Sequence, residues 1–175
     1  MDEARELSRE TVHAGDAFEV HLRVYRHADG EQVTRTVAAH PSSVVIVAHD
    51  GDRVWLVRQP REPVGEAGLL ELPAGKIERS DVSPAAAARR ELAEEAGKAA
   101  ARWEFLGSFY LAPGYSDEQV HLFIATDLSD VARPRAPDTR RMAVEPHPLS
   151  ELDALIAGAG EACTLVGLMA LQRRL

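Results

Sequence analysis

The sequence predicts an α+β fold in which helices flank a mixed β-sheet. The first reason is the order of the hydrophobic patterns, which change from strands to a helix, back to strands, and finally to helices. The second is composition, since 45% of the 175 residues are hydrophobic, enough for a sizeable core and too many for a disordered chain. The third is that no internal repeat and no long linker divides the chain. A single domain of ordinary size is expected.

Strands are expected where apolar residues alternate with polar ones or form a short continuous run. The pairs Asp29–Gly30 and Asp50–Gly51 have the chemistry of tight turns, so each is expected to close a hairpin. The run at residues 44–48 has no polar interruption and indicates the more buried strand of its hairpin. The expected strands comprise residues 18–27, 31–38, 44–48, 54–57, 69–72, 105–111, 120–125 and 142–144.

One helix is predicted with both of its ends. Ser83 is a suitable N-cap, Pro84 suits the first helical position, and Gly97 suits the left-handed residue that follows a helix. Two further helices are expected at residues 150–157 and 162–173, and the polar, proline-containing segment 127–138 is expected to be a loop.

The charge of the chain excludes several classes of protein. The formal net charge is −8 and no basic run is present, so binding to nucleic acid or to an anionic membrane is not expected. No apolar stretch approaches the length of a membrane span, and the first ten residues lack the basic-then-apolar order of a signal peptide. The single cysteine, Cys163, excludes an internal disulfide framework. A cytoplasmic protein is expected.

Three glutamates crowd the end of the predicted helix. Glu94 and Glu95 lie three and four residues after Glu91, which places them beside it on one helix face. Two such charges about 5 Å apart repel by roughly 3 kcal/mol at an effective dielectric constant of about 20, and the helix dipole disfavours anions at this end. One explanation is a solvated acidic face that Arg90 partly neutralises. The other is a site for a divalent cation such as Mg²⁺ or Mn²⁺, which prefer oxygen ligands.

The segments Gly75–Glu78 and Arg90–Gly97 resemble the Nudix box of Nudix hydrolases, which ends in the pattern Arg-Glu-hydrophobic-x-Glu-Glu-x-Gly. Over residues 35–170 the chain is similar to the ADP-ribose pyrophosphatase branch of that family. Pro113, for example, follows Gly97 by sixteen residues, as the distinguishing proline of that branch does. The flanking segments that carry this similarity are residues 57–61, 70–75, 112–118 and 164–168.

The chain departs from the box pattern in its loop. Fifteen steps separate Gly75 from Arg90, where the box has fourteen, so the loop contains one extra residue. The first glutamate of the box is missing, and Asp81 is the nearby residue that can replace it chemically. Lys98 stands where the closing hydrophobic residue is expected, and Pro60 where related sequences usually have an aromatic one.

The resemblance implies a Nudix fold, an α/β/α sandwich around a mixed sheet, and Mg²⁺-dependent cleavage of ADP-ribose to AMP and ribose 5-phosphate, with Mn²⁺ as an alternative ion. It implies metal binding by Glu91, Glu94, Glu95 and the carbonyl of Ala74, with Glu94 central to catalysis, and it implies that Arg90 orients a box carboxylate. It also implies a homodimer. Residues 1–40 are expected to form an N-terminal antiparallel strand region and dimerisation arm, and residues 41–175 the Nudix domain.

An anionic substrate needs local cations on this acidic chain, and the resemblance assigns that role to Arg35 and Arg61, against the alternative of surface arginines at strand ends. Glu71 resembles a residue that supports the metal region and contacts substrate. In the 112–118 segment, Tyr115 either stacks on the substrate or simply packs in the protein. The expected substrate-binding residues are Arg35, Arg61, Glu71, Pro113, Tyr115 and Glu118, where Glu118 is weighed against a loop-surface carboxylate.

Asp138 is the acid expected to activate water, because it is the only acidic residue in the loop 135–141 where the family usually carries its base. The alternatives are that it is a turn residue after Pro137 and that Glu145 is the base. Two other functions remain open: a diphosphatase for a UDP- or GDP-sugar, and a nucleotide-sugar sensor with little turnover.

Overall fold

The computed structural model describes residues 4–133 and 139–175. It divides the chain into two compact units. The first consists of Met1–Ser42 with Tyr110–Gln119, and the second of Ser43–Phe109 with Val120–Leu175. The N-terminal region therefore includes a segment from the middle of the chain, which the sequence patterns do not indicate.

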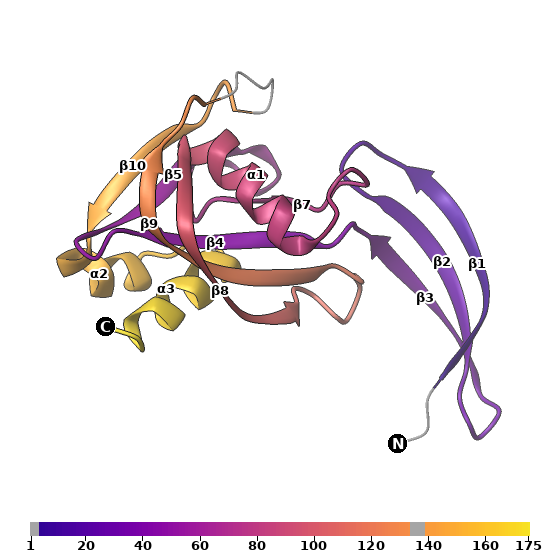
Figure 1. The fold of residues 1–175 in the computed structure, drawn as a ribbon. Helices are drawn as coiled ribbons and strands as arrows, with labels where there is room; N and C mark the ends of the chain where they lie inside the picture. The colour runs from indigo at the N-terminus through magenta and orange to yellow at the C-terminus, as the bar shows by residue number, and fades with distance from the viewer. Residues whose placement is uncertain (1–3, 134–138) are drawn as a thin grey trace. The chain divides into compact units, whose positions relative to one another are not determined.

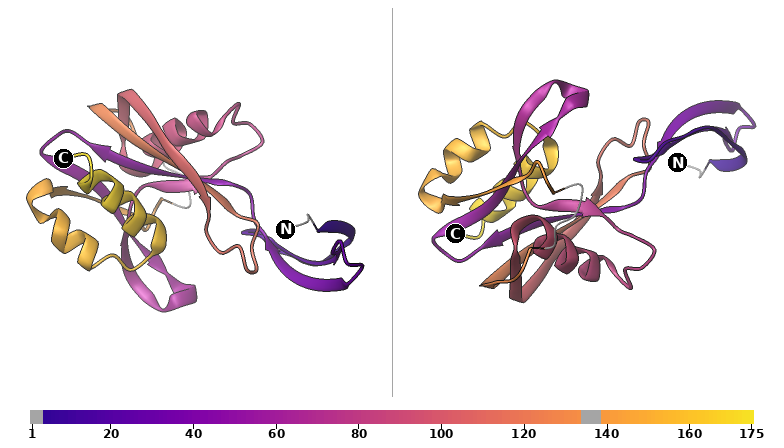
Figure 2. Two further views of the ribbon diagram at one scale, coloured as in Figure 1. Left: turned by 90° about the horizontal axis from the view of Figure 1, so that it is seen from below. Right: turned by 90° about the horizontal axis from the view of Figure 1, so that it is seen from above.

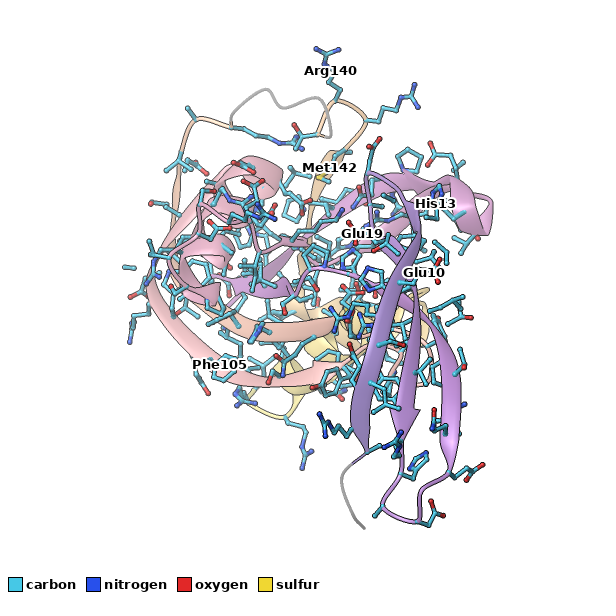
Figure 3. All side chains as sticks on the ribbon, turned by 90° about the vertical axis from the view of Figure 1, so that its right-hand side faces the viewer. Glu10, His13, Glu19, Phe105, Arg140 and Met142 are labelled. Atoms are coloured by element: carbon cyan, nitrogen blue, oxygen red, sulfur yellow. The ribbon has the colours of Figure 1, made fainter. Side chains whose placement is uncertain are left out.

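The first unit contains an antiparallel sheet in the order β1 (Arg5–Ala14), β2 (Glu19–Arg26), β3 (Gln32–Ala39). The hairpin of β2 and β3 is as expected. Strand β1 was not expected, because all ten of its residues are exposed and it therefore has no apolar face to mark it. Figure 3 labels two of its residues, Glu10 and His13.

The second unit is built on a seven-stranded sheet in the order β10-β5-β4-β9-β8, with β6 paired to β5 and β7 paired to β4. Strands β4 and β9 pair in parallel, whereas β5 pairs antiparallel with β4, β6 and β10, and β4 pairs antiparallel with β7, so the expected mixed sheet is confirmed. The strands are β4 (Ser43–His49), β5 (Arg53–Arg61), β6 (Glu66–Glu71), β7 (Ala74–Lys76), β8 (Lys98–Tyr110), β9 (Gln119–Asp130) and β10 (Ala143–Pro148).

Helices cover both faces of this sheet (Figures 1 and 2). Successive side chains of β4 point to opposite faces: Val45 and Val47 pack in the core beneath α2 (Leu152–Ala157) and α3 (Ala162–Gln172), whereas Val44 and Ile46 pack in the core beneath α1 (Pro84–Ala96). The expected α/β/α sandwich is confirmed. Two short 3₁₀ helices, η1 (Glu62–Val64) and η2 (Leu149–Glu151), complete the unit.

Helix α1 begins and ends where the sequence predicts. The hydroxyl of Ser83 accepts a hydrogen bond from the backbone N–H of Ala86 at 3.2 Å, and Gly97 ends the helix with a φ of 63°. Leu92, on the face toward β4, is fully buried. These contacts fix the direction in which the glutamates of the last two turns point.

Several strand boundaries differ from the expectation. β9 runs to Asp130, so the predicted loop at 127–138 begins too early, and β8 begins at Lys98, seven residues before the predicted strand. β8 lies at the edge of the sheet and its first residues are rich in alanine and arginine, so they lack a strand-like alternation. β10 continues through Pro146 and Pro148, which an edge strand tolerates because one of its sides needs no backbone N–H donors. In the described part of the chain, no helix has the length and apolar character required to cross a membrane.

Candidate functional site

The glutamates of α1 face the turn between β6 and β7. Glu91 and Glu95, one helical turn apart, are each only 8% exposed, whereas Glu94 is partly exposed. Glu95 accepts a hydrogen bond from the backbone N–H of Ala74 at 2.9 Å. A Cβ atom on Gly75 would lie 2.0 Å from the carboxylate carbon of Glu91. Gly75 is therefore the residue that lets the Glu91 carboxylate approach the backbone of β7.

Arg90 connects the helix to the loop that precedes it. Its Nη2 donates to Asp81 Oδ2 at 2.8 Å and to the carbonyl oxygen of Lys76 at 2.9 Å. Its Nη1 donates to Glu91 Oε1 at 2.7 Å and to Glu94 Oε2 at 3.2 Å. The hydrogen bond from Arg90 holds the pKa of the Asp81 carboxyl below its ordinary value.

A second pair of charges lies at the end of β5. Glu71 is 5% exposed and accepts hydrogen bonds from Arg61 Nε at 2.7 Å and Arg61 Nη2 at 2.6 Å. Gln59 Nε2 adds a third hydrogen bond to the same carboxylate at 2.9 Å. Two of the three donors come from the bidentate fork of an arginine, the geometry that holds a carboxylate most firmly.

The electrostatics of this cluster suit a hard divalent cation. The pKa of Glu95 is raised to about 8, mainly by burial; the hydrogen bond from the Ala74 N–H opposes this rise and the neighbouring charge of Glu91 contributes to it. Burial also raises the pKa of Glu91, which Arg90 opposes. Such carboxylates are poorly compensated by the protein alone, and their oxygen atoms are the ligands that Mg²⁺ and Mn²⁺ prefer.

The described residues do not present a ready-made metal site, however. Among residues 4–133 and 139–175, no three His, Cys, Asp or Glu side chains are arranged in a way that could hold a metal ion. Arg90 Nη1 binds both Glu91 and Glu94, so part of the donor set is engaged by a guanidinium. The donor chemistry fits a cation, and holding one requires the glutamate side chains to rearrange.

Three of the expected substrate-binding residues line one cavity in the first unit. Arg35 of β3 and the loop residues Pro113 and Tyr115 border a volume of about 400 Å³, together with Tyr25 and Tyr110. The cavity combines one exposed arginine with several aromatic rings, a combination that suits an anionic ligand with a flat ring.

Glu118 lies in the same unit but contacts a different neighbour. Its carboxylate is 3.4 Å from His40 Nδ1, and its side chain is 16% exposed. The structure therefore does not show Glu118 as a loop-surface carboxylate.

Comparison with known proteins decides the family. A family model described as the NUDIX domain matches residues 39–162. The chain belongs to the Nudix family.

Two relatives of this Nudix protein are named ADP-ribose pyrophosphatase. The protein from Mycobacterium tuberculosis (strain ATCC 25618 / H37Rv) is 40% identical over 131 residues, which cover 74% of this chain and 63% of the relative. The protein from Bacillus subtilis (strain 168) is 32% identical over 137 residues, which cover 78% of this chain and 73% of the relative. The chain thus spans less than two thirds of the M. tuberculosis relative.

A solved structure confirms the Nudix fold. The crystal structure of a protein described as an ADP compounds hydrolase matches with a TM-score of 0.83 and 24% identity, covering 100% of this chain and 95% of the other.

The acids considered as the general base of the Nudix site have different outcomes. Asp138 lies outside the described residues. Glu145 is bound by Arg58 through two hydrogen bonds of 2.7 and 3.0 Å, which lower its pKa. A carboxylate paired in this way is a weak base, so the structure gives Glu145 no advantage over Asp138.

One residue with a role in each unit was not predicted. Gln59, which binds Glu71, lies in a segment that the sequence marks only by resemblance. Arg23 forms an ion pair with Asp117 at 2.6 Å and is 6% exposed. An arginine on an alternating strand normally belongs to the solvated face, so no pattern in the sequence indicates that Arg23 is buried.

Proposed function

We propose that this protein hydrolyses the diphosphate of ADP-ribose to AMP and ribose 5-phosphate with Mg²⁺ as cofactor. The observation that carries the proposal is the buried carboxylate cluster of Glu91 and Glu95 against Gly75 in a Nudix chain. The names of the two relatives support ADP-ribose as the substrate.

In this proposal the metal is held by Glu91, Glu94, Glu95 and the carbonyl oxygen of Ala74. When bound, Mg²⁺ neutralises diphosphate oxygens and lowers the pKa of a coordinated water. Arg90 remains fixed through its bonds to Asp81 and Lys76, and it orients the glutamates as a positioning residue. Asp138 is proposed to accept the proton of the attacking water.

The substrate is proposed to contact Arg35, Arg61, Glu71, Pro113, Tyr115 and Glu118. Glu71 holds Nε and Nη2 of Arg61, which fixes the plane of the guanidinium. Arg61 Nη1, which does not bind Glu71, is then the nitrogen expected to contact a phosphate. Arg35 supplies a second positive charge next to the aromatic side chains of its cavity.

We also propose that the protein is a homodimer in which β1 contributes to the contact. Every residue of β1 is exposed, and its apolar members Leu7 and Val12 are 37% and 49% exposed. Light scattering coupled to size-exclusion chromatography is expected to give twice the chain mass of 19.1 kDa. A mass equal to one chain would contradict this part of the proposal.

A substrate panel tests the activity. The purified protein is incubated with ADP-ribose, a UDP-sugar or a GDP-sugar, each with Mg²⁺, with Mn²⁺ or with EDTA, and the products are separated by ion-exchange chromatography. AMP from ADP-ribose is expected with a divalent ion, with the highest kcat/KM in the panel, and no product is expected with EDTA. Faster cleavage of a UDP- or GDP-sugar would reject ADP-ribose but retain the reaction class. Tight binding without turnover would identify a sensor.

A further inference from the structure

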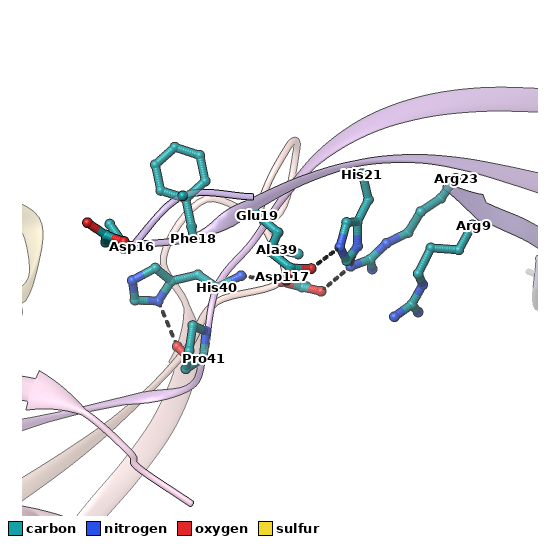
Figure 4. Close-up of a pocket in the computed structure, with 12 residues that line it drawn as sticks. Arg9, Asp16, Phe18, Glu19, His21, Arg23, Ala39, His40, Pro41 and Asp117 are labelled. Atoms are coloured by element: carbon teal, nitrogen blue, oxygen red, sulfur yellow. Dashed lines mark hydrogen bonds and ion pairs between the residues drawn. The ribbon is translucent and has the colours of Figure 1, made fainter. Parts of the chain in front are cut away.

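A chain of polar side chains runs through the first unit, from β2 to the loop of residues 111–118 (Figure 4). Arg23 and His21 are each only 6% exposed. Arg23 Nη2 donates to Asp117 Oδ2 at 2.6 Å and to His21 Nδ1 at 3.1 Å, and His21 Nε2 donates to Glu19 Oε2 at 2.7 Å. A buried guanidinium is destabilising unless it is paired, so Asp117 is the residue that allows Arg23 to lie there.

Asp117 uses its other oxygen to hold the end of β3. Oδ1 accepts a hydrogen bond from the backbone N–H of His40 at 3.0 Å. Asp117 therefore joins three segments, namely β2, the residue after β3, and its own loop, although Arg23 and Asp117 are 94 positions apart in the sequence.

The same loop is attached to β3 through uncharged contacts. The backbone N–H of Ala38 donates to the carbonyl oxygen of Tyr115 at 2.7 Å, and the Ser116 hydroxyl donates to the carbonyl oxygen of Ala38 at 2.9 Å. These bonds fix residues 115 and 116 at one point on β3. The ion pair of Asp117 adds a second point, on β2, which stops the loop from pivoting about the first.

Arg23 also lies directly opposite Arg35 in the β2–β3 register. Directly opposed residues of an antiparallel pair share one face of the sheet, and like charges there repel. Asp117 neutralises Arg23 and reduces this repulsion, so the guanidinium of Arg35 is left to bind an anionic ligand. Both arginines and Asp117 line the cavity that Pro113 and Tyr115 border.

From this arrangement we infer that Arg23 and Asp117 are positioning residues for substrate binding. Neither serves as a catalytic group. Together they hold the Pro113–Tyr115 segment and Arg35 in the arrangement that receives the nucleotide sugar. The inference rests on the proposed function, in which this cavity contacts the substrate.

The test compares Asp117→Asn with wild type. Asparagine retains an oxygen that can accept from His40 N–H but loses the charge that pairs with Arg23. For ADP-ribose with Mg²⁺, KM is expected to rise at least tenfold while kcat changes less than threefold. Arg23→Met is expected to behave like Asp117→Asn, and Arg23→Lys, which keeps a charge for Asp117, is expected to recover most of the loss.

Asp127→Asn is the matched control. Asp127 pairs with Arg102 at 2.6 Å, the same distance as in the Arg23–Asp117 pair, but this pair is exposed and belongs to the second unit. The control is expected to keep both KM and kcat. An equal rise of KM in Asp127→Asn would overturn the inference, because the effect would then not depend on the loop.

Hydrogen exchange provides a readout that needs no substrate. Backbone amides of residues 111–118 are expected to exchange at least tenfold faster in Asp117→Asn than in wild type, with no change in Asp127→Asn. Unchanged exchange in this loop, or faster exchange with an unchanged KM, would overturn the inference. If wild type does not cleave ADP-ribose, the proposed function fails, whereas the exchange result still decides whether the ion pair positions the loop.

Discussion

At the proposed metal site the Glu91 carboxylate lies so close to Gly75 that a Cβ atom there would overlap it. Adding a single methyl group at residue 75 tests whether this close approach matters. We predict that Gly75→Ala weakens Mn²⁺ binding at least tenfold, because the new Cβ would overlap the Glu91 carboxylate and push it aside. Titration calorimetry measures the effect. Gly114→Ala is the control for metal binding, since no atom lies within 4 Å of a Cβ at that position. Equal Mn²⁺ affinity in both variants would contradict the prediction.

Substitution of Glu94 is expected to affect catalysis but not stability. We predict that Glu94→Gln lowers kcat at least 100-fold, as expected for loss of a metal ligand, while the free energy of unfolding changes by less than about 0.5 kcal/mol. Arg90 keeps its contacts with Asp81 and Glu91 in the variant, so the loop remains attached. Urea unfolding and steady-state kinetics measure the two quantities. Glu104→Gln, at an exposed ion pair, serves as control. A strongly destabilised variant would show that Glu94 is structural.

At this scale the sequence predicts the identity of important residues better than their partners. The spacing of Glu91, Glu94 and Glu95 indicates a shared helix face. The pairing of Arg90 with Glu94 follows from their spacing, but the sequence does not indicate that the same Arg90 nitrogen also binds Glu91, or that Arg90 binds Asp81 across a loop with an extra residue. Such pairings depend on how side chains meet after folding, which no local pattern records.

Among the elements, α1 carries the glutamates of the proposed metal site. Its N-cap residue, Ser83, is expected to contribute to the stability of the helix. We predict that Ser83→Ala destabilises the protein by about 1 kcal/mol, because the backbone N–H of Ala86 loses the Ser83 hydroxyl as an acceptor and keeps only the Ser83 carbonyl oxygen. Ser150→Ala, at an exposed position outside α1, is the control and is expected to change stability by less than about 0.5 kcal/mol. Equal unfolding midpoints in urea for both variants would show that the cap contributes nothing.

Elements with chemical signals at their ends were predicted well, and elements without such signals were missed. α1 has a capping serine, a proline and a left-handed glycine, so both of its boundaries are encoded locally. β1 has no buried face and the first half of β8 has no strand-like alternation, and both form because a neighbouring strand offers hydrogen bonds. That information lies in the partner strand and is absent from the segment itself.

For the whole molecule, we expect the response of stability to pH to depend on the partly buried His121 as well as on acids. Burial lowers the pKa of His121 below 6.5, its ordinary value. As the pH falls below 6.5 the unfolded chain therefore takes up the proton before the folded protein does, and the free energy of unfolding decreases. We predict that His121→Gln loses less stability than wild type between pH 7.5 and 5.5.

Urea unfolding at the two pH values, with EDTA present to remove metal ions, measures this difference. The control is His13→Gln, because His13 lies on the exposed strand β1. The control is expected to follow wild type. If His121→Gln also follows wild type, His121 does not contribute to the pH dependence.

The general architecture was predictable because the sheet is mixed, its central strand is apolar on both faces, and the order of elements allows few alternatives. In contrast, the sequence could not predict that residues 110–119 belong to the first unit, because the contacts that place them there join positions far apart in the chain.

This shared membership affects how the protein can be recombined with its relatives. Tyr110–Gln119 belongs with the N-terminal strands, so an exchange of the N-terminal region made at a single crossover after Ser42 would combine β2 of one parent with the loop of another. An acidic residue replacing Arg23 would then face Asp117 without a counter-charge. A working chimera needs two crossovers, or a donor parent that itself has arginine at 23 and aspartate at 117, so these two positions are expected to be inherited together.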